Sequence, residues 1–369
     1  MTKITPEDSS LNGLSSERTI SSLRLQNYRS YSDFAVELSP GVNIVVGQNA
    51  SGKTNLLEAI LLICGDKPYR ASIVDTVKYG QDWARIDSQS QGNSRVLKII
   101  KNQDIVDKTF DLNGKIKKRL NFEEKLPVVL FEPEHMRLLT GSPELRRTFV
   151  DDILAETDPV YGSLLASYKR TLIQRNKLLK QPLNIAKQQI FVWNVRLSEL
   201  AGLVVEKRLD LIKQLNEQAS DIYSQIANHK TVVKLVYETK VNTKNYQTDM
   251  LHKLEKNIDQ DFMRGFTGYG PHREDIIVYI RNQPASISAS RGETRTLVLT
   301  LKILEKKLIE KYRNVKPIIL LDDVFSELDG ARRKSLTGYL KDYQTIITTT
   351  DADLISKNFA QHTNLISLV

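Results

Sequence analysis

A phosphate-binding loop and an acidic strand end stand far apart in this chain, and their separation limits the folds that it can adopt. Residues 47–54 read Gly-Gln-Asn-Ala-Ser-Gly-Lys-Thr, after a buried strand pattern and before an amphipathic helix pattern. That order is the context in which such a loop binds nucleotide phosphates. Asp322 and Asp323 follow the apolar run 318–321, and Asp322 lies 269 positions (322 − 53) after Lys53. Compact nucleotide-binding domains join such elements through short crossovers, so a large insertion must lie between them.

The chemistry of the loop gives a role to its positions. Gly47 and Gly52 let the backbone curl so that its amides face phosphate oxygens, and the following helix adds its positive end. Lys53 supplies a positive charge for the β- and γ-phosphates, and the Thr54 hydroxyl is a ligand for Mg²⁺. We therefore predict ATP and Mg²⁺ as cofactors. The predicted ATP-binding loop consists of Gly47, Gln48, Asn49, Ala50, Ser51, Gly52, Lys53 and Thr54.

The two acids that follow the apolar run 318–321 complete this predicted site. Carboxylates at the carboxyl end of a buried parallel strand emerge at the edge of the sheet where ligands bind. We predict that Asp322 joins Thr54 in holding Mg²⁺, directly or through water, and that Asp323 orients or deprotonates the attacking water. Lys53 and Asp323 are thus the predicted catalytic residues.

A second phosphate-binding segment precedes the acidic strand. Ser290, Arg291, Gly292 and Glu293 stand before a helix pattern, and the serine and the glutamate are spaced as a capping box. A helix start with free amides also binds phosphate, and in a dimer it can reach the nucleotide of the partner. We call these four residues the signature segment. After the acidic strand, residues 326–329 form a short polar loop that ends in Asp329.

The chain divides into four segments. Residues 1–19 carry no apolar core and are expected to form a disordered leader. Residues 20–141 and 265–369 show strand and helix patterns, and we predict the two halves of one α/β P-loop ATPase head, with a mixed sheet and flanking helices. Residues 142–264 show helical spacing with dense charges and are predicted to form an inserted α-helical arm lobe. The expected strands are 23–25, 34–38, 42–46, 96–100, 105–112, 127–131, 276–280, 318–321 and 345–349.

The charge balance favours a polyanionic partner. Lys and Arg number 53 against 44 Asp and Glu, which gives a net charge of +9. Because aromatic residues make up only 7% and are scattered, contact with the backbone of duplex or junction DNA is favoured over base stacking. A solvated surface explains each basic cluster equally well, since the sequence does not show which residues share a face. The candidate DNA contacts are Lys115, Lys117, Lys118, Arg119, Arg170 and Arg175.

Several features predict a cytoplasmic protein with no membrane partner. The start of the chain lacks the basic and apolar regions of an export signal. The longest apolar run, 56–64, is about half the ~20 residues that a membrane-spanning helix needs. Cys64 is the one cysteine, so the chain forms no internal disulfide and no cysteine-rich zinc site.

The ordered set of motifs resembles the ABC-type ATPase heads of the SMC and RecF group. It is most similar to the bacterial RecF family, and the likeness runs from about residue 20 to the C-terminus with its motifs in family order. The motifs outside the nucleotide site are residues 25–31 (Leu-Gln-Asn-Tyr-Arg-Ser-Tyr), 131–134 (Phe-Glu-Pro-Glu), 141–143 (Gly-Ser-Pro), Arg146, Arg147, Asp151 and 270–273 (Gly-Pro-His-Arg).

The resemblance implies an ATP-driven, head-to-head homodimer that binds DNA at gaps or junctions and helps to load a recombinase. ATP would lie between the phosphate loop of one copy and Ser290 and Gly292 of the other, with Asp329 at the seam. Slow, DNA-stimulated hydrolysis and the partners RecO and RecR are also implied. Two positions depart from the ABC pattern. The signature reads Ser-Arg-Gly-Glu in place of the fuller Leu-Ser-Gly-Gly-Gln of transporter heads, so we expect Arg291 to add a direct phosphate or dimer contact. Thr350 stands where many heads carry a histidine, so a histidine switch for the γ-phosphate is not expected.

Two other classes of protein stay open. The energy-coupling subunit of a membrane transporter shares the nucleotide motifs, but its acidic strand follows the loop at less than half the spacing seen here. A regulatory or defence ATPase without a DNA ligand could use the same head. Only the RecF-like motifs outside the nucleotide site argue against that second class.

Overall fold

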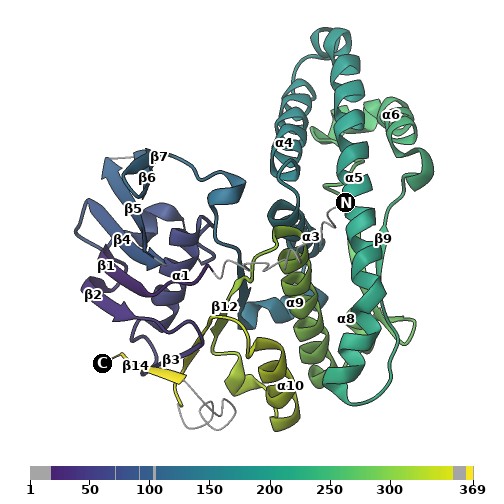
Figure 1. Ribbon diagram of the computed structural model, residues 1–369. Helices are drawn as coiled ribbons and strands as arrows, with labels where there is room; N and C mark the ends of the chain where they lie inside the picture. The colour runs from purple at the N-terminus through teal and green to yellow at the C-terminus, as the bar shows by residue number, and fades with distance from the viewer. Residues whose placement is uncertain (1–17, 71, 91, 103–104, 352–362, 369) are drawn as a thin grey trace, which may run out of the picture.

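The computed structural model describes residues 18–351 and 363–368, apart from 71, 91, 103 and 104 (Figure 1). A five-stranded sheet in the order β14-β3-β13-β12-β8 forms its centre, and every neighbouring pair in it is parallel. Its strands are β3 (Val42–Val46), β8 (Val128–Phe131), β12 (Ile318–Asp322), β13 (Thr345–Thr349) and β14 (Thr363–Ser367).

The two ends of the chain interleave in this sheet. The early strand β3 pairs with β13 and β14, and the late strand β12 pairs with β8 (Figure 1). The N-terminal half supplies β3 and β8, which do not pair with each other, and β3 separates β14 from the other two strands of the C-terminal half. The central sheet is therefore built from both ends of the chain.

Alternating side chains of the parallel strands enter two different hydrophobic cores. Ile318 and Leu320 pack with helix α1 (Lys53–Cys64) on one face of the sheet. Ile319 and Leu321 pack with helix α9 (Arg291–Arg313) on the other. A strand that is buried on both faces needs a continuous apolar run, which is the pattern that predicted β12.

An antiparallel sheet in the order β2-β1-β4-β5-β6-β7 covers α1 from the other side. The predicted hairpin near the start is β1 with β2, and residues 105–112 form β6 as predicted. The sequence analysis missed β4, although its buried residues alternate along the strand. The strands are β1 (Ser22–Tyr28), β2 (Tyr31–Glu37), β4 (Trp83–Ser90), β5 (Asn93–Asn102), β6 (Ile105–Leu112) and β7 (Lys115–Lys117).

A long helical arm rises beside the head (Figure 1). Helix α5 (Leu183–Ala227) is 45 residues long and packs against α4 (Tyr161–Leu178) and α9. The segment predicted to be helical also holds strand β9 (Val233–Glu238), which pairs antiparallel with β10 (Asp275–Ile280). The sequence analysis did not predict β9, whose pairing joins the arm to the C-terminal half of the head.

The remaining elements are short or lie at the base of the arm. They are α2 (Arg137–Thr140), α3 (Pro143–Thr157), α6 (Tyr246–Lys256), α7 (Ile258–Arg264), β11 (Gln283–Pro284), α8 (Ala285–Ser288) and α10 (Gly330–Leu340), with 3₁₀ turns at Ile73–Thr76, Phe122–Glu124, Pro133–Met136, Thr243–Asn245 and Phe325–Glu327. The predicted leader falls outside the described residues up to position 17. Arg18 donates a hydrogen bond to the Glu123 carbonyl over 2.8 Å. None of the helices in the described part of the chain is long and apolar enough to span a membrane.

Candidate nucleotide-binding site

The phosphate loop is curled so tightly that two of its positions require glycine. A Cβ on Gly47 would lie 2.4 Å from Ser51 Oγ and 2.9 Å from the Leu368 carbonyl oxygen. Gly52 caps α1 with a φ of 98°, a conformation that other residues adopt only under strain. The loop thus forms the narrow backbone cradle that the sequence predicted.

Lys53 braces the loop from inside. Its side chain is largely buried, and its ammonium donates to the carbonyl oxygens of Gly47 and Gln48, both over 2.7 Å. An ammonium has three donors, so one is left for a phosphate oxygen. Ser51 Oγ is buried in the same cradle and has no hydrogen-bond partner among the described residues. A bound phosphate would satisfy both groups, and the loop therefore fits ATP.

Asp322 stands beside Thr54 even though 268 positions separate them in the chain. The Thr54 hydroxyl lies 3.0 Å from Asp322 Oδ1 and 3.1 Å from Oδ2. The Thr348 hydroxyl, from the neighbouring strand β13, donates to Oδ1 over 2.9 Å. A hydroxyl and a carboxylate are the hard oxygen ligands that Mg²⁺ prefers. The structure brings together the two residues predicted to hold the metal.

Two further residues contact Asp322, and the sequence analysis missed both. The Tyr69 hydroxyl and Arg70 Nη2 each lie 3.1 Å from Asp322 Oδ2. Burial and the nearby Asp322 charge raise the pKa of Tyr69, which is a hydrogen-bond donor at neutral pH. Neither residue belongs to a recognisable motif, because each reaches the site through the irregular segment after α1. Thr348 was within reach of prediction, since it lies near the end of the strand beside β12.

Asp323 adopts a backbone conformation that is uncommon for a residue other than glycine. Its φ is 54°, and its amide donates to the Thr348 hydroxyl over 3.0 Å. The Ser326 hydroxyl lies 2.6 Å from the Asp323 carbonyl oxygen and 3.1 Å from Oδ1. A strained residue at the end of a buried strand persists only where neighbouring groups hold it, and such positions cluster at functional sites.

The signature segment forms the predicted capping box at the start of α9. The Ser290 hydroxyl accepts from the Glu293 amide over 3.3 Å, and Glu293 accepts from the Ser290 amide over 2.8 Å. Arg281 pairs with the same glutamate, and these contacts lower the pKa of Glu293 to about 2. Ser290 and Arg291 are exposed, so this helix start is open to a ligand.

Asp329 is the N-cap of α10, and its carboxylate accepts from the Arg332 amide over 2.9 Å. The Arg332 side chain pairs with Asp329 and donates from Nε to Thr296 Oγ1 of α9 over 2.8 Å. A Cβ on Gly292 would lie 3.2 Å from Arg332 Nη2. Arg332 thus ties the polar loop after the acidic strand to the signature helix, a link that the sequence analysis did not identify.

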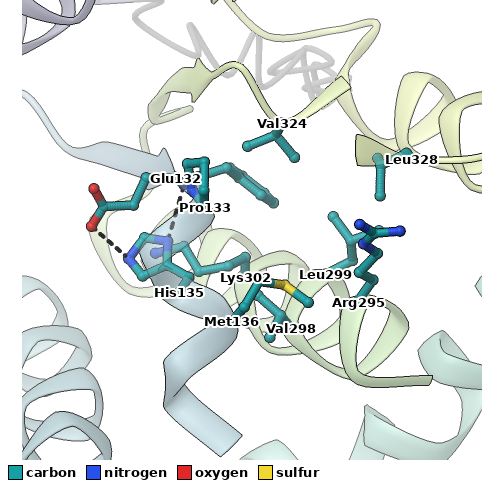
Figure 2. Close-up of a pocket in the computed structure, with 11 residues that line it drawn as sticks. Glu132, Pro133, His135, Met136, Arg295, Val298, Leu299, Lys302, Val324 and Leu328 are labelled. Atoms are coloured by element: carbon teal, nitrogen blue, oxygen red, sulfur yellow. Dashed lines mark hydrogen bonds and ion pairs between the residues drawn. The ribbon is translucent and has the colours of Figure 1, made fainter. Parts of the chain in front are cut away.

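A mostly apolar pocket lies between these motifs and contains none of the phosphate-loop residues. Figure 2 shows Val298 and Leu299 of α9 on one side, with Val324 and Leu328 from the loop after β12 nearby. Glu132, of the Phe-Glu-Pro-Glu motif, lines the same pocket, and burial raises its pKa to about 7. The pocket therefore lies where the Phe-Glu-Pro-Glu motif, the signature helix α9 and the loop after β12 pack together.

The predicted DNA contacts differ in their surroundings. Lys115, Lys118 and Arg119 are exposed at the edge strand β7 and just beyond it, whereas Lys117 pairs with Glu124. Arg170 is exposed on α4 and donates to Ser167 over 3.1 Å. These five residues stay candidates, with Lys117 the least available.

Arg175 does not fit the prediction that it contacts DNA. Its side chain is fully buried, and it bonds to Asp261 over 2.8 Å, to Thr267 over 2.7 Å and to Asn194 over 2.7 Å. A guanidinium enclosed by its own acid and amide partners has no path to a phosphate. The prediction failed because helical spacing alone does not show which face of α4 lies against α5 and the turn before β10.

Three of the RecF-like motifs outside the nucleotide site contribute residues that join the arm to the head. Arg146 makes a double hydrogen bond to Asp275 of β10, over 2.8 and 2.7 Å. Asp151 accepts two bonds of 2.9 Å from the buried Arg208 of α5. Arg208 also donates to the Pro271 carbonyl, in the Gly-Pro-His-Arg motif, over 2.8 Å. These motif residues stabilise the base of the arm.

His272 of that motif has a defined tautomer. Its Nε2 lies 3.2 Å from the Thr267 carbonyl, which can only accept, so Nε2 carries the proton. Nδ1 then accepts from the Tyr168 hydroxyl over 2.6 Å. Burial lowers the pKa of His272 to about 4, and the ring is neutral at pH 7.

Comparison with known proteins agrees with this geometry. Residues 19–367 match the family model described as the RecF/RecN/SMC N terminal domain. The chain is 36% identical over 340 residues to the DNA replication and repair protein RecF of Streptococcus thermophilus, covering 90% of this chain and 92% of that protein. It is 32% identical over 357 residues to the protein of the same name from Clostridium perfringens, covering 95% and 98%.

Solved structures show the same likeness. A structure of the recombination mediator protein RecF with ATP, in the RecFOR pathway, superposes with a TM-score of 0.82 at 25% identity and covers 92% of this chain and 94% of that one. The Smc head domain of Pyrococcus furiosus superposes with a TM-score of 0.50 at 18% identity over 92% of this chain and 91% of that one. The second similarity supports the ABC-type head fold alone.

Proposed function

The chain belongs to the RecF family, and from that premise we propose that it is an ATP-dependent DNA repair protein that works as an ATP-closed dimer. The observation that carries the proposal is the 3.0 Å contact between Thr54 and Asp322, which assembles one nucleotide site from the two ends of the chain. A solved relative is described with ATP, and the phosphate loop of this chain has a buried ammonium and a buried hydroxyl suited to phosphate.

We assign the steps of ATP hydrolysis to residues of this site. The loop amides and Lys53 bind the phosphates, and Thr54 with Asp322 would hold Mg²⁺. When bound, Mg²⁺ neutralises charge on the phosphate oxygens. Asp323 accepts a hydrogen bond from the attacking water and orients it, while Ser326 and Thr348 hold Asp323 in position. Substitution of the metal ligands or of Asp323 would test these roles separately.

The positions of the two phosphate-binding segments support the proposal of a dimer. Helix α1 belongs to the core on one face of the parallel sheet, and α9 belongs to the core on the other face. Ser290 at the start of α9 is exposed, so it is available to a second copy. We propose that Ser290 and Gly292 of one copy contact the ATP held by its partner, with Asp329 at the seam.

We propose that DNA lies across a basic surface on the head, and we call this surface the head basic patch. It consists of Lys67, Lys108, Lys115, Lys118, Arg119 and Lys125. Lys115, Lys118 and Arg119 are exposed on β7 or just after it. Burial lowers the pKa of Lys108, and the nearby charges of Lys125, Arg119 and Lys67 lower it further while Asp66 opposes them. Such a cluster of cations suits the phosphate backbone of DNA. The Arg170 region of the arm is a second candidate contact.

The partners follow from the same family. The solved relative is described as a mediator in the RecFOR pathway, and we propose RecR and RecO as partners of this chain at gapped DNA. Hydrolysis is proposed to be slow and stimulated by DNA.

A DNA-binding assay tests this function. Single-stranded, duplex and gapped DNA are compared by fluorescence anisotropy, with and without ATP and Mg²⁺. We expect binding that requires ATP and that favours duplex or gapped DNA over single strands, because the protein offers cations rather than an aromatic platform. Binding of equal strength without nucleotide would contradict the proposal.

A further inference from the structure

The Asp322 carboxylate is surrounded by hydrogen-bond donors from four residues, which leaves no lone pair open for a metal ion. Its Oδ2 atom lies 3.1 Å from the Thr54 hydroxyl, from the Tyr69 hydroxyl and from Arg70 Nη2. Its Oδ1 atom receives a bond from Thr348 over 2.9 Å. The carboxylate is nearly buried, so protein groups supply almost all of its partners.

We propose that Arg70, supported by Tyr69, is a resident counter-ion of Asp322 that a divalent cation must displace, so that these two residues set the metal affinity of the site. The inference deepens the proposed function, because it rests on Thr54 and Asp322 as metal ligands. It names two positioning residues outside the phosphate loop and the acidic strand.

Displacement follows from the geometry around Oδ2. Mg²⁺ binds carboxylate oxygens at about 2.0–2.1 Å and demands near-octahedral geometry. A carboxylate oxygen offers about two lone-pair positions. Tyr69 and Arg70 already donate to Oδ2, and the single proton of the Thr54 hydroxyl is shared between Oδ1 and Oδ2. A cation at Oδ2, held directly or through water, would therefore have to displace one of these donors, and Arg70 is the one that carries a positive charge.

Arg70 can leave at low cost. Its side chain is 53% exposed, whereas that of Asp322 is 5% exposed. The guanidinium carbon lies 5.6 Å from the centre of the Tyr69 ring, a contact that steadies it at the rim of the site. An exposed arginine keeps most of its hydration when it swings away. The buried carboxylate, in contrast, must always have a cation or donors.

The consequence is a threshold for metal entry. Without a competing cation, Arg70 offsets part of the cost of the buried Asp322 charge. A divalent ion replaces it only when its own contacts, including those to nucleotide phosphates, outweigh the broken ion pair. Removing the Arg70 charge should therefore tighten metal binding, and restoring a charge at that position should partly reverse the gain.

The test measures Mn²⁺ binding by electron paramagnetic resonance, with the full-length protein and saturating ADP. We expect Arg70→Gln to lower the Mn²⁺ dissociation constant about 10-fold, Arg70→Lys to lower it less, and Tyr69→Phe to lower it about 2-fold. The matched control is Arg24→Gln, since Arg24 is also 53% exposed in its pair with Asp33. The control should leave the dissociation constant unchanged.

Thermal unfolding gives a second readout that does not depend on turnover. Added Mn²⁺ and ADP should raise the melting temperature of Arg70→Gln more than that of the wild type, because a tighter ligand stabilises the folded state more. An Arg70→Gln protein with unchanged or weaker Mn²⁺ affinity would overturn the inference while leaving the proposed function standing. A wild-type protein that binds no Mn²⁺ with ADP would overturn the metal site and the inference together.

Discussion

Two arginine–carboxylate pairs in this protein use the same chemistry in opposite surroundings. At the nucleotide site, Arg70 is half exposed over the buried Asp322. Within the arm, Arg175 and Asp261, which we call the arm pair, are both fully buried, and Asn194 and Thr267 also accept hydrogen bonds from Arg175. Arg70 of the first pair is in contact with water, so it can move away from Asp322. Both members of the second pair are buried, so removing one would leave the charge of the other buried without a partner.

The difference separates residues that act on ligands from residues that hold the fold. Arg208 with Asp151 resembles the arm pair, with both side chains buried and a bond to the Pro271 carbonyl. Arg146 and Asp151, two charged residues of the RecF-like motifs, therefore anchor the arm to the head. Four changes, taken from the largest expected effect to the smallest, test this division.

Breaking the arm pair should cost the most stability. Arg175→Met leaves Asp261 buried without its cation, and we expect the free energy of unfolding to fall by about 3–5 kcal/mol. The control is Arg170→Met, on the same helix but exposed, which should change stability by less than about 0.5 kcal/mol. Urea unfolding of both variants measures the contrast. Similar values for the two would show that burial does not distinguish these arginines.

Acid should weaken the arm base through His272. Its folded pKa of about 4 lies below the ordinary value of 6.5, so the unfolded chain takes up the proton first. The contribution of the neutral His272 ring to the free energy of unfolding is fully present above pH 6.5. It falls by about 2–3 kcal/mol as the pH drops to 4. His272→Gln cannot take up this proton. The stability advantage of wild type over His272→Gln, followed by urea unfolding from pH 7 to pH 4, should shrink by that amount, and a constant difference would disprove it.

If Asp323 acts on the attacking water, its substitution should slow ATP hydrolysis without changing the fold. Asp323→Asn should slow ATP hydrolysis about 100-fold, the usual contribution of a general base. Because Asp322 still holds the metal, the variant should bind ATP and stay on DNA longer. Single-turnover hydrolysis and DNA dissociation rates measure the two effects. Hydrolysis at the wild-type rate would remove Asp323 from the mechanism.

The head basic patch should give the smallest effect. Lys118→Glu with Arg119→Glu should weaken DNA binding about 10-fold at moderate salt. The same change should flatten the dependence of the binding constant on salt by about two units of slope, one for each phosphate that is no longer neutralised. Lys240→Glu with Lys244→Glu, two exposed lysines in the arm region, is the charge-matched control. If both double variants bound DNA equally weakly, the net charge of the protein and not the head basic patch would explain the effect.

The nucleotide site was predictable because its residues carry their chemistry in local patterns. The phosphate loop, the acidic strand and the capping box each occupy a few consecutive positions, and each has one structural context. The sequence also predicted that the head is split between the two ends of the chain, because Asp322 lies 269 positions (322 − 53) after Lys53. The same local reasoning found Ser290 and Glu293 as partners, which the structure confirms.

What could not be predicted depends on contacts between distant segments. Arg70 reaches Asp322 across 252 positions, and Arg175 reaches Asp261 across 86. Neither has a local pattern that separates it from an ordinary surface cation. For both arginines the deciding information is which surfaces pack, and a single sequence does not contain it. Strand β9 was missed for another reason: residues 231–238 are rich in strand-forming residues, but they follow a 45-residue helix in a segment that was assigned as helical throughout.

The central claim is that ATP is held between two copies, with the signature segment acting on the nucleotide of its partner. Light scattering of wild type, Lys53→Met and Ser290→Arg with ATP and Mg²⁺ tests it most directly. We predict that wild type doubles its mass from 42.1 kDa, and that Lys53→Met does not. Ser290→Arg should bind ATP through its intact loop and yet remain a monomer. A Ser290→Arg protein that dimerises like wild type, or a wild type that stays at the monomer mass, would contradict the account.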